Sequence, residues 1–422
     1  MIKRRGIMKK IISLTVFLAF ILCGCSSNKG AQEAALSEVP VSEASTEPII
    51  PETSTTATNK TINPSDTYTI ELKDEEPEPA FTSVNIVCAG DNLIHTPIYR
   101  QAKERSTDGT YYDFSYAYQN VAHLIGEADL AILNQETIIS DEYEPSTYPS
   151  FCSPTDLAEE MLNIGFDAFS ISNNHVLDKG EKGLLSTLNF WKTAHPDIPV
   201  YGAYENEDDM NNIRMLTVNG IKFAFLGYME HTNGISLPKD SECRVTYLSN
   251  EDLIEEQVRK ASETADCVIV SVHFGIEVTT VISQQQYDFA QKLADWGADI
   301  IVGTQPHTIQ SMEYLNKADG GKAFVFYCLG NFLSAMDNPY SMVEYLGRIT
   351  VTKDTGSGEI TISNPNAVPL INHYDAYYQN IRVYPFSEYT KELAAAHGCK
   401  NTSYEFFEQV INENIPSEFL AE

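Results

Sequence analysis

Five short apolar runs in this chain end in side chains that can bind a metal ion. Two of the runs lead into carboxylates, Asp91 and Glu136, one leads into the pair Asn174-His175, and two lead into imidazoles, His273 and His307. A mixed set of carboxylate, amide and imidazole ligands suits Mn²⁺, Zn²⁺ or Fe better than Ca²⁺. Two such ions, roughly 3.5–4 Å apart, could hold the attacking and leaving oxygens of a phosphoester or a similar group. The sequence therefore predicts a divalent metal site with one or two ions.

Each residue of this set also has a simpler explanation. A step such as Gly90-Asp91 is usually a turn that caps a helix, a lone His at a strand end is usually structural, and Glu136 could be a surface charge. Their shared position favours a site, because every one of these side chains follows an apolar run. In a parallel sheet, ligands bind beyond the carboxyl ends of the strands.

The apolar runs are short, nearly continuous and rich in Val, Ile and Phe, which predicts strands with both faces covered. The candidate strands are Val84–Ala89, Asp129–Leu133, Ala168–Ile171, Lys222–Tyr228, Cys267–His273, Ile300–Val302 and Ala323–Leu329. The segments between them predict helices at Tyr116–Ile125, Thr155–Asn163, Lys182–Ala194, Ser249–Thr264 and Ser283–Trp296. This alternation predicts an α/β domain with a largely parallel sheet. After Gly347, a turn at Asp354–Gly358 predicts a hairpin of added antiparallel strands.

The ordered motifs resemble the bacterial capsule-synthesis family typified by CapA, the poly-γ-glutamate capsule proteins, a family that is similar to the calcineurin-like metallophosphoesterases. The matching segments are Ala89–Asp91, Leu133–Glu136, Ser172–Gly180, Val270–Glu277, Gly303–His307 and Leu329–Phe332. They span about Val84–Asn372. The resemblance implies a four-layer α/β/β/α sandwich of two mixed sheets, as in the metallophosphoesterases.

The resemblance also implies roles for single residues. Those implied to bind metal are Asp91, Glu136, Asn174, His273, Gln305 and His307. Glu136 would take the place of the bridging carboxylate. His175 would stabilise developing charge or protonate the leaving group, with Asp178 as the second catalytic residue.

Two positions depart from the family pattern. Leu93 stands where phosphoesterases usually carry a His, and Gln305 stands where the last motif usually has its first His. Gln is a neutral and weaker ligand than imidazole, so a two-metal centre, a single-metal site and a site that binds without turnover all stay open. Among the remaining histidines, His95 is kept as a candidate because it lies close to Asp91. The others are predicted to be surface or structural residues, and they are His123, His195, His231, His373 and His397.

Residues 1–24 have the pattern of an export signal. Basic residues precede an apolar run, Ile11–Leu22, that is short for a permanent membrane span. The run leads into Gly24-Cys25, which resembles the lipobox of bacterial lipoproteins. The resemblance implies a lipid on Cys25 and a place at the extracytoplasmic face of the cell membrane, and an ordinary secretory signal is the alternative. Residues 25–80 are predicted to form a disordered acidic tether, and residues 81–422 a globular domain.

The chain has 28 Lys and Arg against 59 Asp and Glu, a net charge of −31, which argues against a nucleic-acid partner. Cys88, Cys267 and Cys328 lie in strand-like runs and are predicted to be buried small hydrophobes. No CxxC spacing occurs, so no disulfide framework is predicted.

Three functional interpretations follow. The first is a membrane-anchored capsule or poly-γ-glutamate biosynthesis protein that performs metal-dependent hydrolysis or transfer on an envelope polymer. The second is a non-catalytic capsule assembly or export factor that binds an anionic polymer such as poly-γ-glutamate. In both, the expected partners are that polymer and the capsule synthesis proteins of the membrane. A solute-binding lipoprotein ranks last, because it would not need this series of metal ligands.

Overall fold

The computed structural model describes residues 80–421. The predicted signal at 1–24, its Cys25 and all but the last residue of the predicted tether at 25–80 therefore lie outside the described residues. The domain predicted from residue 81 begins with strand β1 at Phe81.

The larger sheet has eight strands in the order β16-β15-β14-β1-β2-β3-β4, with β13 also beside β1. Strands β1 to β4 and β13 run parallel to one another, and β14, β15 and β16 add antiparallel neighbours. The bounds are β1 (Phe81–Asn92), β2 (Leu130–Asn134), β3 (Ala168–Ser170), β4 (Val200–Tyr201), β13 (Asn331–Leu333), β14 (Val343–Asp354), β15 (Ile360–Asp375) and β16 (Gln379–Pro385). The antiparallel hairpin predicted after Gly347 is the β14–β15 pair.

The smaller sheet has six strands in the order β11-β12-β10-β9-β7-β6. Its four central strands are parallel, and the two edge strands are antiparallel to their neighbours. The bounds are β6 (Arg214–Val218), β7 (Ile221–Met229), β9 (Cys267–His273), β10 (Ile300–Thr304), β11 (Met312–Asn316) and β12 (Lys322–Phe326). Every residue of β9 is buried, as expected for a strand that is covered on both faces. A third sheet pairs β5 (Ala203–Tyr204) with β8 (Arg244–Val245).

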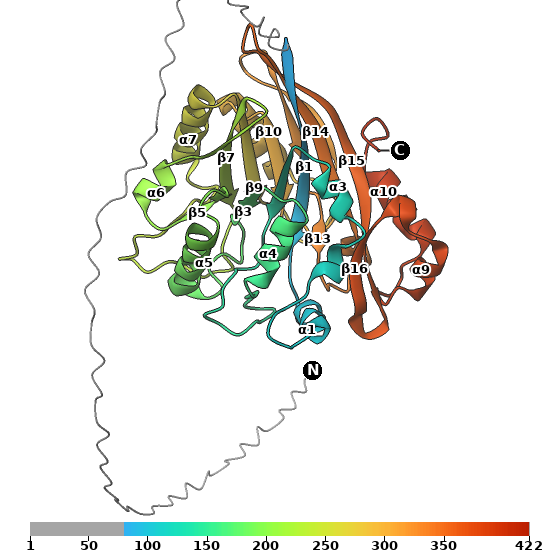
Figure 1. The fold of residues 1–422 in the computed structure, drawn as a ribbon. Coiled ribbons are helices and arrows are strands. Elements are labelled where there is room, and N and C mark those ends of the chain that lie inside the picture. Colours follow the sequence, from blue (N-terminus) through green and yellow to red (C-terminus); the bar gives the residue numbers. More distant parts are fainter. Residues whose placement is uncertain (1–79, 422) are drawn as a thin grey trace, which may run out of the picture. The chain divides into compact units, whose positions relative to one another are not determined.

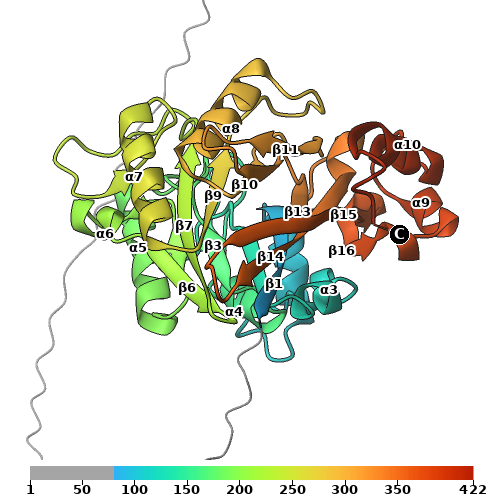
Figure 2. The ribbon, with the colours of Figure 1, turned by 90° about the horizontal axis from the view of Figure 1, so that it is seen from above.

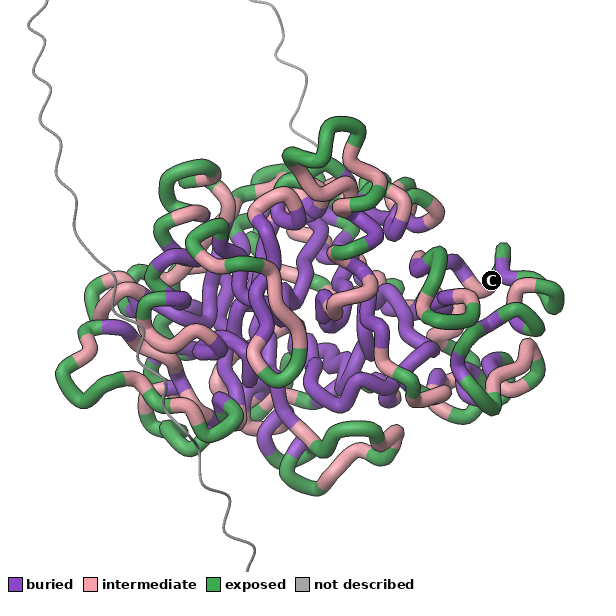
Figure 3. Tube along the Cα trace, turned by 90° about the horizontal axis from the view of Figure 1, so that it is seen from below, coloured by how far each residue is buried: buried purple, intermediate pink, exposed green. Residues whose placement is uncertain are grey.

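Helices cover the outer faces of the two main sheets, so the domain has four layers (Figures 1 and 2). One hydrophobic cluster joins the facing sides of the sheets and extends to α4 (Asp156–Asn163) and α5 (Gly180–Ala194). A second cluster packs the smaller sheet against α7 (Glu251–Thr264) and α8 (Gln284–Trp296). The predicted four-layer α/β/β/α sandwich of two mixed sheets is confirmed. Figure 3 shows the burial running along the central strands and the exposure in the outer loops.

The remaining helices lie outside these layers or at their edges. They are α1 (Thr96–Arg105), α2 (Ser115–Tyr118), α3 (Ala122–Gly126), α6 (Glu207–Asn211), α9 (Lys391–Ala396) and α10 (Tyr404–Asn414), with short 3₁₀ turns at Pro339–Met342, Ala376–Tyr378 and Phe386–Glu388. The single helix predicted at Tyr116–Ile125 is wrong, since the segment splits into α2 and α3. Bonds to the third preceding carbonyl, from Val121 N–H to Tyr118 and from Leu124 N–H to Val121, replace the α-helical bonds there.

The six cysteines of the described part of the chain are free and buried. Burial was predicted for Cys88, Cys267 and Cys328, and it extends to Cys152, Cys243 and Cys399 as well. Within residues 80–421, no helix is both long and apolar enough to cross a bilayer.

Gly90 allows the close approach that sets the end of β1. A Cβ at this position would lie 1.9 Å from the carbonyl oxygen of Gly330 and 2.9 Å from its carbonyl carbon. The next residue, Asp91, donates its N–H to that same oxygen at 3.0 Å. The absence of a side chain at Gly90 thus lets the loop before β13 hold Asp91.

We predict that Gly90→Ala lowers the free energy of unfolding by roughly 2–3 kcal/mol, because its methyl group overlaps backbone that cannot move aside cheaply. Gly126→Ala is the matched control, since its Cβ would meet only the Ile164 oxygen, at 3.7 Å, and we expect a change within about 0.5 kcal/mol. Denaturant-induced unfolding measures both. Equal stabilities for the two variants would contradict the prediction.

Candidate metal centre

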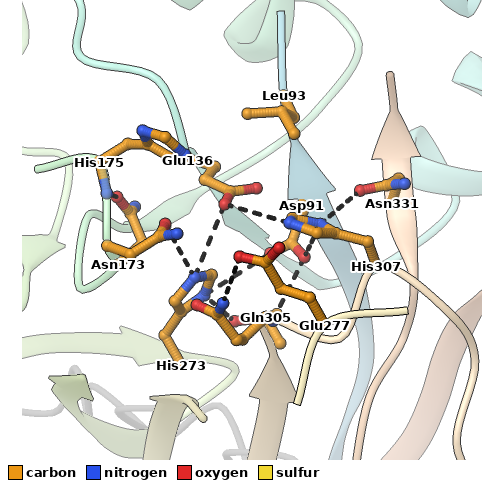
Figure 4. Close-up of polar contacts among 12 residues, drawn as sticks. Asp91, Leu93, Glu136, Asn173, His175, His273, Glu277, Gln305, His307 and Asn331 are labelled. Carbon is orange, nitrogen blue, oxygen red and sulfur yellow. Dashed lines mark hydrogen bonds and ion pairs between the residues drawn. The ribbon is translucent and has the colours of Figure 1, made fainter. Parts of the chain in front are cut away.

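Three side chains from distant parts of the sequence meet where the parallel strands end. Asp91 is in β1, Glu136 follows β2, and His307 follows β10. One ligand atom from each lies within 4.8 Å of the others. His307 Nδ1 is 3.1 Å from Asp91 Oδ2, and its Nε2 is 3.8 Å from Glu136 Oε1 (Figure 4). All three residues are buried.

His273 and Asn174 complete the predicted group. His273 Nε2 is 3.6 Å from Glu136 Oε1, and its Nδ1 is 3.8 Å from Asp91 Oδ1. The Asn174 amide oxygen lies 3.2 Å from His273 Nε2. The structure therefore brings together five of the six residues predicted to bind metal.

Partners outside the centre orient both imidazoles. Nδ1 of His273 lies 2.8 Å from the Thr304 hydroxyl, and Nδ1 of His307 lies 2.9 Å from the Asn331 amide oxygen. With Nδ1 engaged in this way, each ring turns its Nε2 toward Glu136. Such outer contacts fix the tautomer and the direction of a ligating His.

The Glu136 carboxylate is the least compensated charge of the centre. It is fully buried, and neither of its oxygens has a hydrogen-bond partner. Burial raises the pKa of Glu136 well above its ordinary value, and the charge of Asp91 raises it further. Among residues 80–421, no Lys or Arg forms an ion pair with Asp91 or Glu136, and the basic side chains close to them are the two imidazoles. Because native proteins rarely bury a carboxylate without a donor, this donor set fits a divalent metal ion.

The two imidazoles differ in protonation. Burial lowers the pKa of His273 to about 3, so the ring is neutral and can act as a ligand. Burial also lowers the pKa of His307, but the charge of Glu136 and the hydrogen bond to Asp91 outweigh it and raise the value to about 10. Burial would raise the pKa of Asp91, but the hydrogen bond from His307 and the charges of both rings hold it below its ordinary value. Without metal, a proton on His307 therefore balances part of the carboxylate charge.

The predicted catalytic pair lies next to this group. His175 Nδ1 is 2.8 Å from Asp178 Oδ2, and the same oxygen accepts the Phe151 N–H at 2.6 Å. A carboxylate only accepts, so Nδ1 carries the proton and Nε2 is left for another partner. The Phe151 ring packs edge-on against His175.

His95, kept as a candidate from the sequence, also packs edge-on against the Phe151 ring. Its Nδ1 lies 3.0 Å from the Leu93 carbonyl oxygen and 3.2 Å from the Ala335 backbone nitrogen, and burial lowers the pKa of His95 to about 4. His95 is thus a neutral residue beside the site, with no hydrogen bond to the carboxylates.

Gln305 contacts the metal centre through its backbone N–H. Its N–H donates to Asp91 Oδ2 at 3.3 Å, while its side-chain amide donates to Glu277 Oε1 at 3.2 Å. The ligand role predicted for its side chain stays a prediction. Leu93 is buried and supplies no ligand atom, in agreement with the sequence.

Asn233, on the loop that follows β7, was missed by the sequence reasoning. Its amide oxygen accepts a hydrogen bond from Asn174 Nδ2 at 3.4 Å, and its Nδ2 lies 3.5 Å from His175 Nδ1. The signal was present, because β7 is another parallel strand that runs into polar residues, in this case Glu230–Asn233. His231 of that segment is exposed, as predicted.

Comparison with known proteins gives the family. The model of the bacterial capsule synthesis protein PGA_cap family matches residues 85–336, so the chain belongs to this family. A capsule biosynthesis protein CapA of Bacillus anthracis is 28% identical over 255 residues, 59% of each chain. A PGA biosynthesis protein CapA of Bacillus subtilis is 31% identical over 183 residues, 41% of this chain and 44% of that protein. The chain thus matches about half of the length of these curated relatives.

Two solved structures are also similar. A phosphatase from Mycoplasma pneumoniae has a TM-score of 0.43 and 13% identity, covering 68% of this chain and 94% of that one. A 5'-nucleotidase from Candida albicans has a TM-score of 0.37 and 15% identity, covering 67% of this chain and 51% of that one. Since both scores are below 0.5, the fold assignment rests on the strand order of the two sheets.

We predict that Mn²⁺ or Zn²⁺ stabilises the metal-depleted protein, by about 2.7 kcal/mol at a free ion concentration of 100 times Kd. Glu136→Gln should abolish most of this shift. Glu344→Gln is the control, because Glu344 is also buried with two unpartnered oxygens but forms no ion pair with His273 or His307. Thermal unfolding with and without metal measures the effect, and an equal metal response in the two variants would refute the assignment.

Metal binding should also release a proton from His307. Since its pKa is raised to about 10 in the metal-free protein, the ring is protonated at neutral pH and must lose that proton to act as a ligand. We therefore expect metal affinity to rise by up to about tenfold per pH unit between pH 6 and 8. Titration calorimetry in buffers of different ionisation enthalpy counts the protons, and a pH-independent affinity would argue against His307 as a ligand.

Proposed function

We propose that this capsule-synthesis family member is an extracytoplasmic, lipid-anchored enzyme that hydrolyses or transfers an ester or amide bond of an envelope polymer. The observation that carries the proposal is the meeting of an uncompensated buried carboxylate with two imidazoles, beside the pair His175–Asp178. Because one relative is named as a PGA biosynthesis protein, the polymer we propose is poly-γ-glutamate. The lipid on Cys25 and the membrane partners from capsule synthesis belong to the same proposal and are supported by the sequence pattern of residues 1–25.

The proposed metal ligands are Asp91, Glu136, Asn174, His273 and His307. A divalent ion held there would supply Lewis-acid polarisation of the scissile carbonyl group. Asn134 Nδ2 donates to Asp91 Oδ1 at 2.7 Å and fixes the direction of that carboxylate. The burial of the group excludes bulk water, which strengthens each electrostatic interaction inside it.

His175 is the proposed general acid. Asp178 holds the Nδ1–H of His175, so the ring keeps one orientation and presents Nε2 for transfer of a proton to the leaving group. Asp178 is itself held by the Phe151 N–H, and the Lys179 ammonium is turned to the Ser150 hydroxyl and carbonyl oxygen instead. The Lys179 ammonium therefore does not compete with His175 for the Asp178 carboxylate.

A second candidate function is a capsule assembly or export factor that binds an anionic polymer without turnover. The observation in its favour is that two positions where metallophosphoesterases usually carry a histidine ligand hold other residues. Leu93 is apolar, and the Gln305 amide is engaged with Glu277, so neither supplies a further imidazole to the centre.

We predict that His175→Asn lowers kcat on model esters or γ-glutamyl amides by about 10²–10⁴-fold, the usual contribution of a positioned acid, while metal affinity stays unchanged. His123→Asn on the exposed side of α3 is the control and should leave kcat as it is. Steady-state kinetics of the metal-loaded protein measures both. Wild-type protein that binds metal and polymer but shows no turnover would favour the assembly factor.

A further inference from the structure

Glu277 lies on the loop between β9 and α8 and has no role in the site described so far. Its Oε1 accepts a hydrogen bond from Gln305 Nε2 at 3.2 Å, and the backbone N–H of Gln305 donates to Asp91 Oδ2 at 3.3 Å. One residue thus links Glu277 to a carboxylate of the centre. Figure 4 shows the Glu277 carboxylate directed toward the space between Glu136, His273 and His307.

The loop that carries Glu277 is held in this conformation from both sides. Val278 has a φ of 57°, a left-handed value that is rare for a β-branched residue, and its N–H donates to the Pro306 carbonyl at 2.8 Å. The Gly275 N–H donates to Glu230 Oε2 at 3.2 Å. Strained backbone persists only where the surrounding contacts impose it, and it concentrates at functional sites. The inward direction of Glu277 is therefore built into the loop.

The direction of this side chain is unfavourable without a cation. Glu277 is an exposed residue between Ile276, 66% exposed, and Val278, 40% exposed, although its hydrogen bond with Gln305 is partly buried. Like charges repel across short distances in a partly buried site, and Asp91 and Glu136 already place two carboxylates there. Glu277 adds a third carboxylate to this group, and a divalent cation would offset the added negative charge.

We propose that Glu277 is a further ligand of the cation at this centre, supplied from the solvent side, and that Gln305 is the residue that positions it. This inference rests on the metal centre of the proposed function. Asp91, Glu136 and His307 supply ligand atoms from the buried side, and a cation held by them needs oxygen or nitrogen ligands on its open side as well. Glu277 is the carboxylate that the 274–283 loop brings to that side.

The test is calorimetric titration of Mn²⁺ into the metal-depleted full-length protein and three variants. Glu277→Gln removes the charge and should weaken binding by about tenfold or more, the scale seen when a metal site loses a supporting group. Glu277→Asp keeps the charge but withdraws the carboxylate by one methylene, and it should weaken binding by at least about fivefold. Glu263→Gln, at an exposed position of α7, removes the same charge on the outer helix layer and should bind within about twofold of wild type.

The outcomes distinguish a failure of the Glu277 inference from a failure of the metal centre on which it rests. If the wild-type protein binds no Mn²⁺, the metal centre itself is wrong. If the wild type binds and Glu277→Asp binds equally well, Glu277 acts through charge alone and its role as a ligand is overturned. X-ray absorption of the Zn²⁺-loaded proteins gives a second readout, because Glu277→Gln should lose an oxygen neighbour of the metal or lengthen that contact. Unchanged coordination would overturn the inference. Melting temperatures without metal check that each variant is folded.

Discussion

The buried carboxylate of Glu136 is the constraint around which the centre is organised. It lies in the interior with no donor on either oxygen, and two imidazoles turn their Nε2 atoms toward it. Thr304 and Asn331 hold the opposite ring nitrogens, so the rings cannot rotate to serve other acceptors. In the metal-free protein, a proton on His307 relieves part of the charge. This explains why the pKa values of His273 and His307 move in opposite directions although both rings are buried.

Two sheets are needed to build this arrangement. Asp91 aligns with Asn134 across β1 and β2 of the larger sheet, and His273 aligns with Thr304 across β9 and β10 of the smaller one. The carboxylates and imidazoles therefore come mostly from different sheets, and they face each other because the parallel strands of both sheets end on the same side. Small errors in the packing of sheet on sheet would separate the two kinds of ligand. The close contact of Gly90 with Gly330 fixes the position of Asp91 within the larger sheet.

Much of the centre was predictable from the sequence, because strand ends in parallel sheets converge. That rule located Asp91, Glu136, Asn174, His175, His273 and His307, and the family resemblance supplied the four layers. The direction of the Gln305 side chain and the inward turn of Glu277 were not predictable, since they depend on left-handed backbone angles at Gln305 and Val278 that no periodic pattern encodes. The split of the helix predicted at Tyr116–Ile125 has a similar origin, because local bonding in the turn after Tyr118 overrides its apolar spacing.

The length of strand β1 separates the first described residues of the chain from the cluster of carboxylates and imidazoles. Phe81 begins the strand and Asp91 lies near its other end, a span of roughly 33 Å for ten residue steps at about 3.3 Å each. The first described residues therefore lie at the end of β1 that is remote from the cluster. A bead or sensor chip joined directly at Ala80 would be fixed far from the cluster, which suits binding measurements with high-molecular-weight polymers.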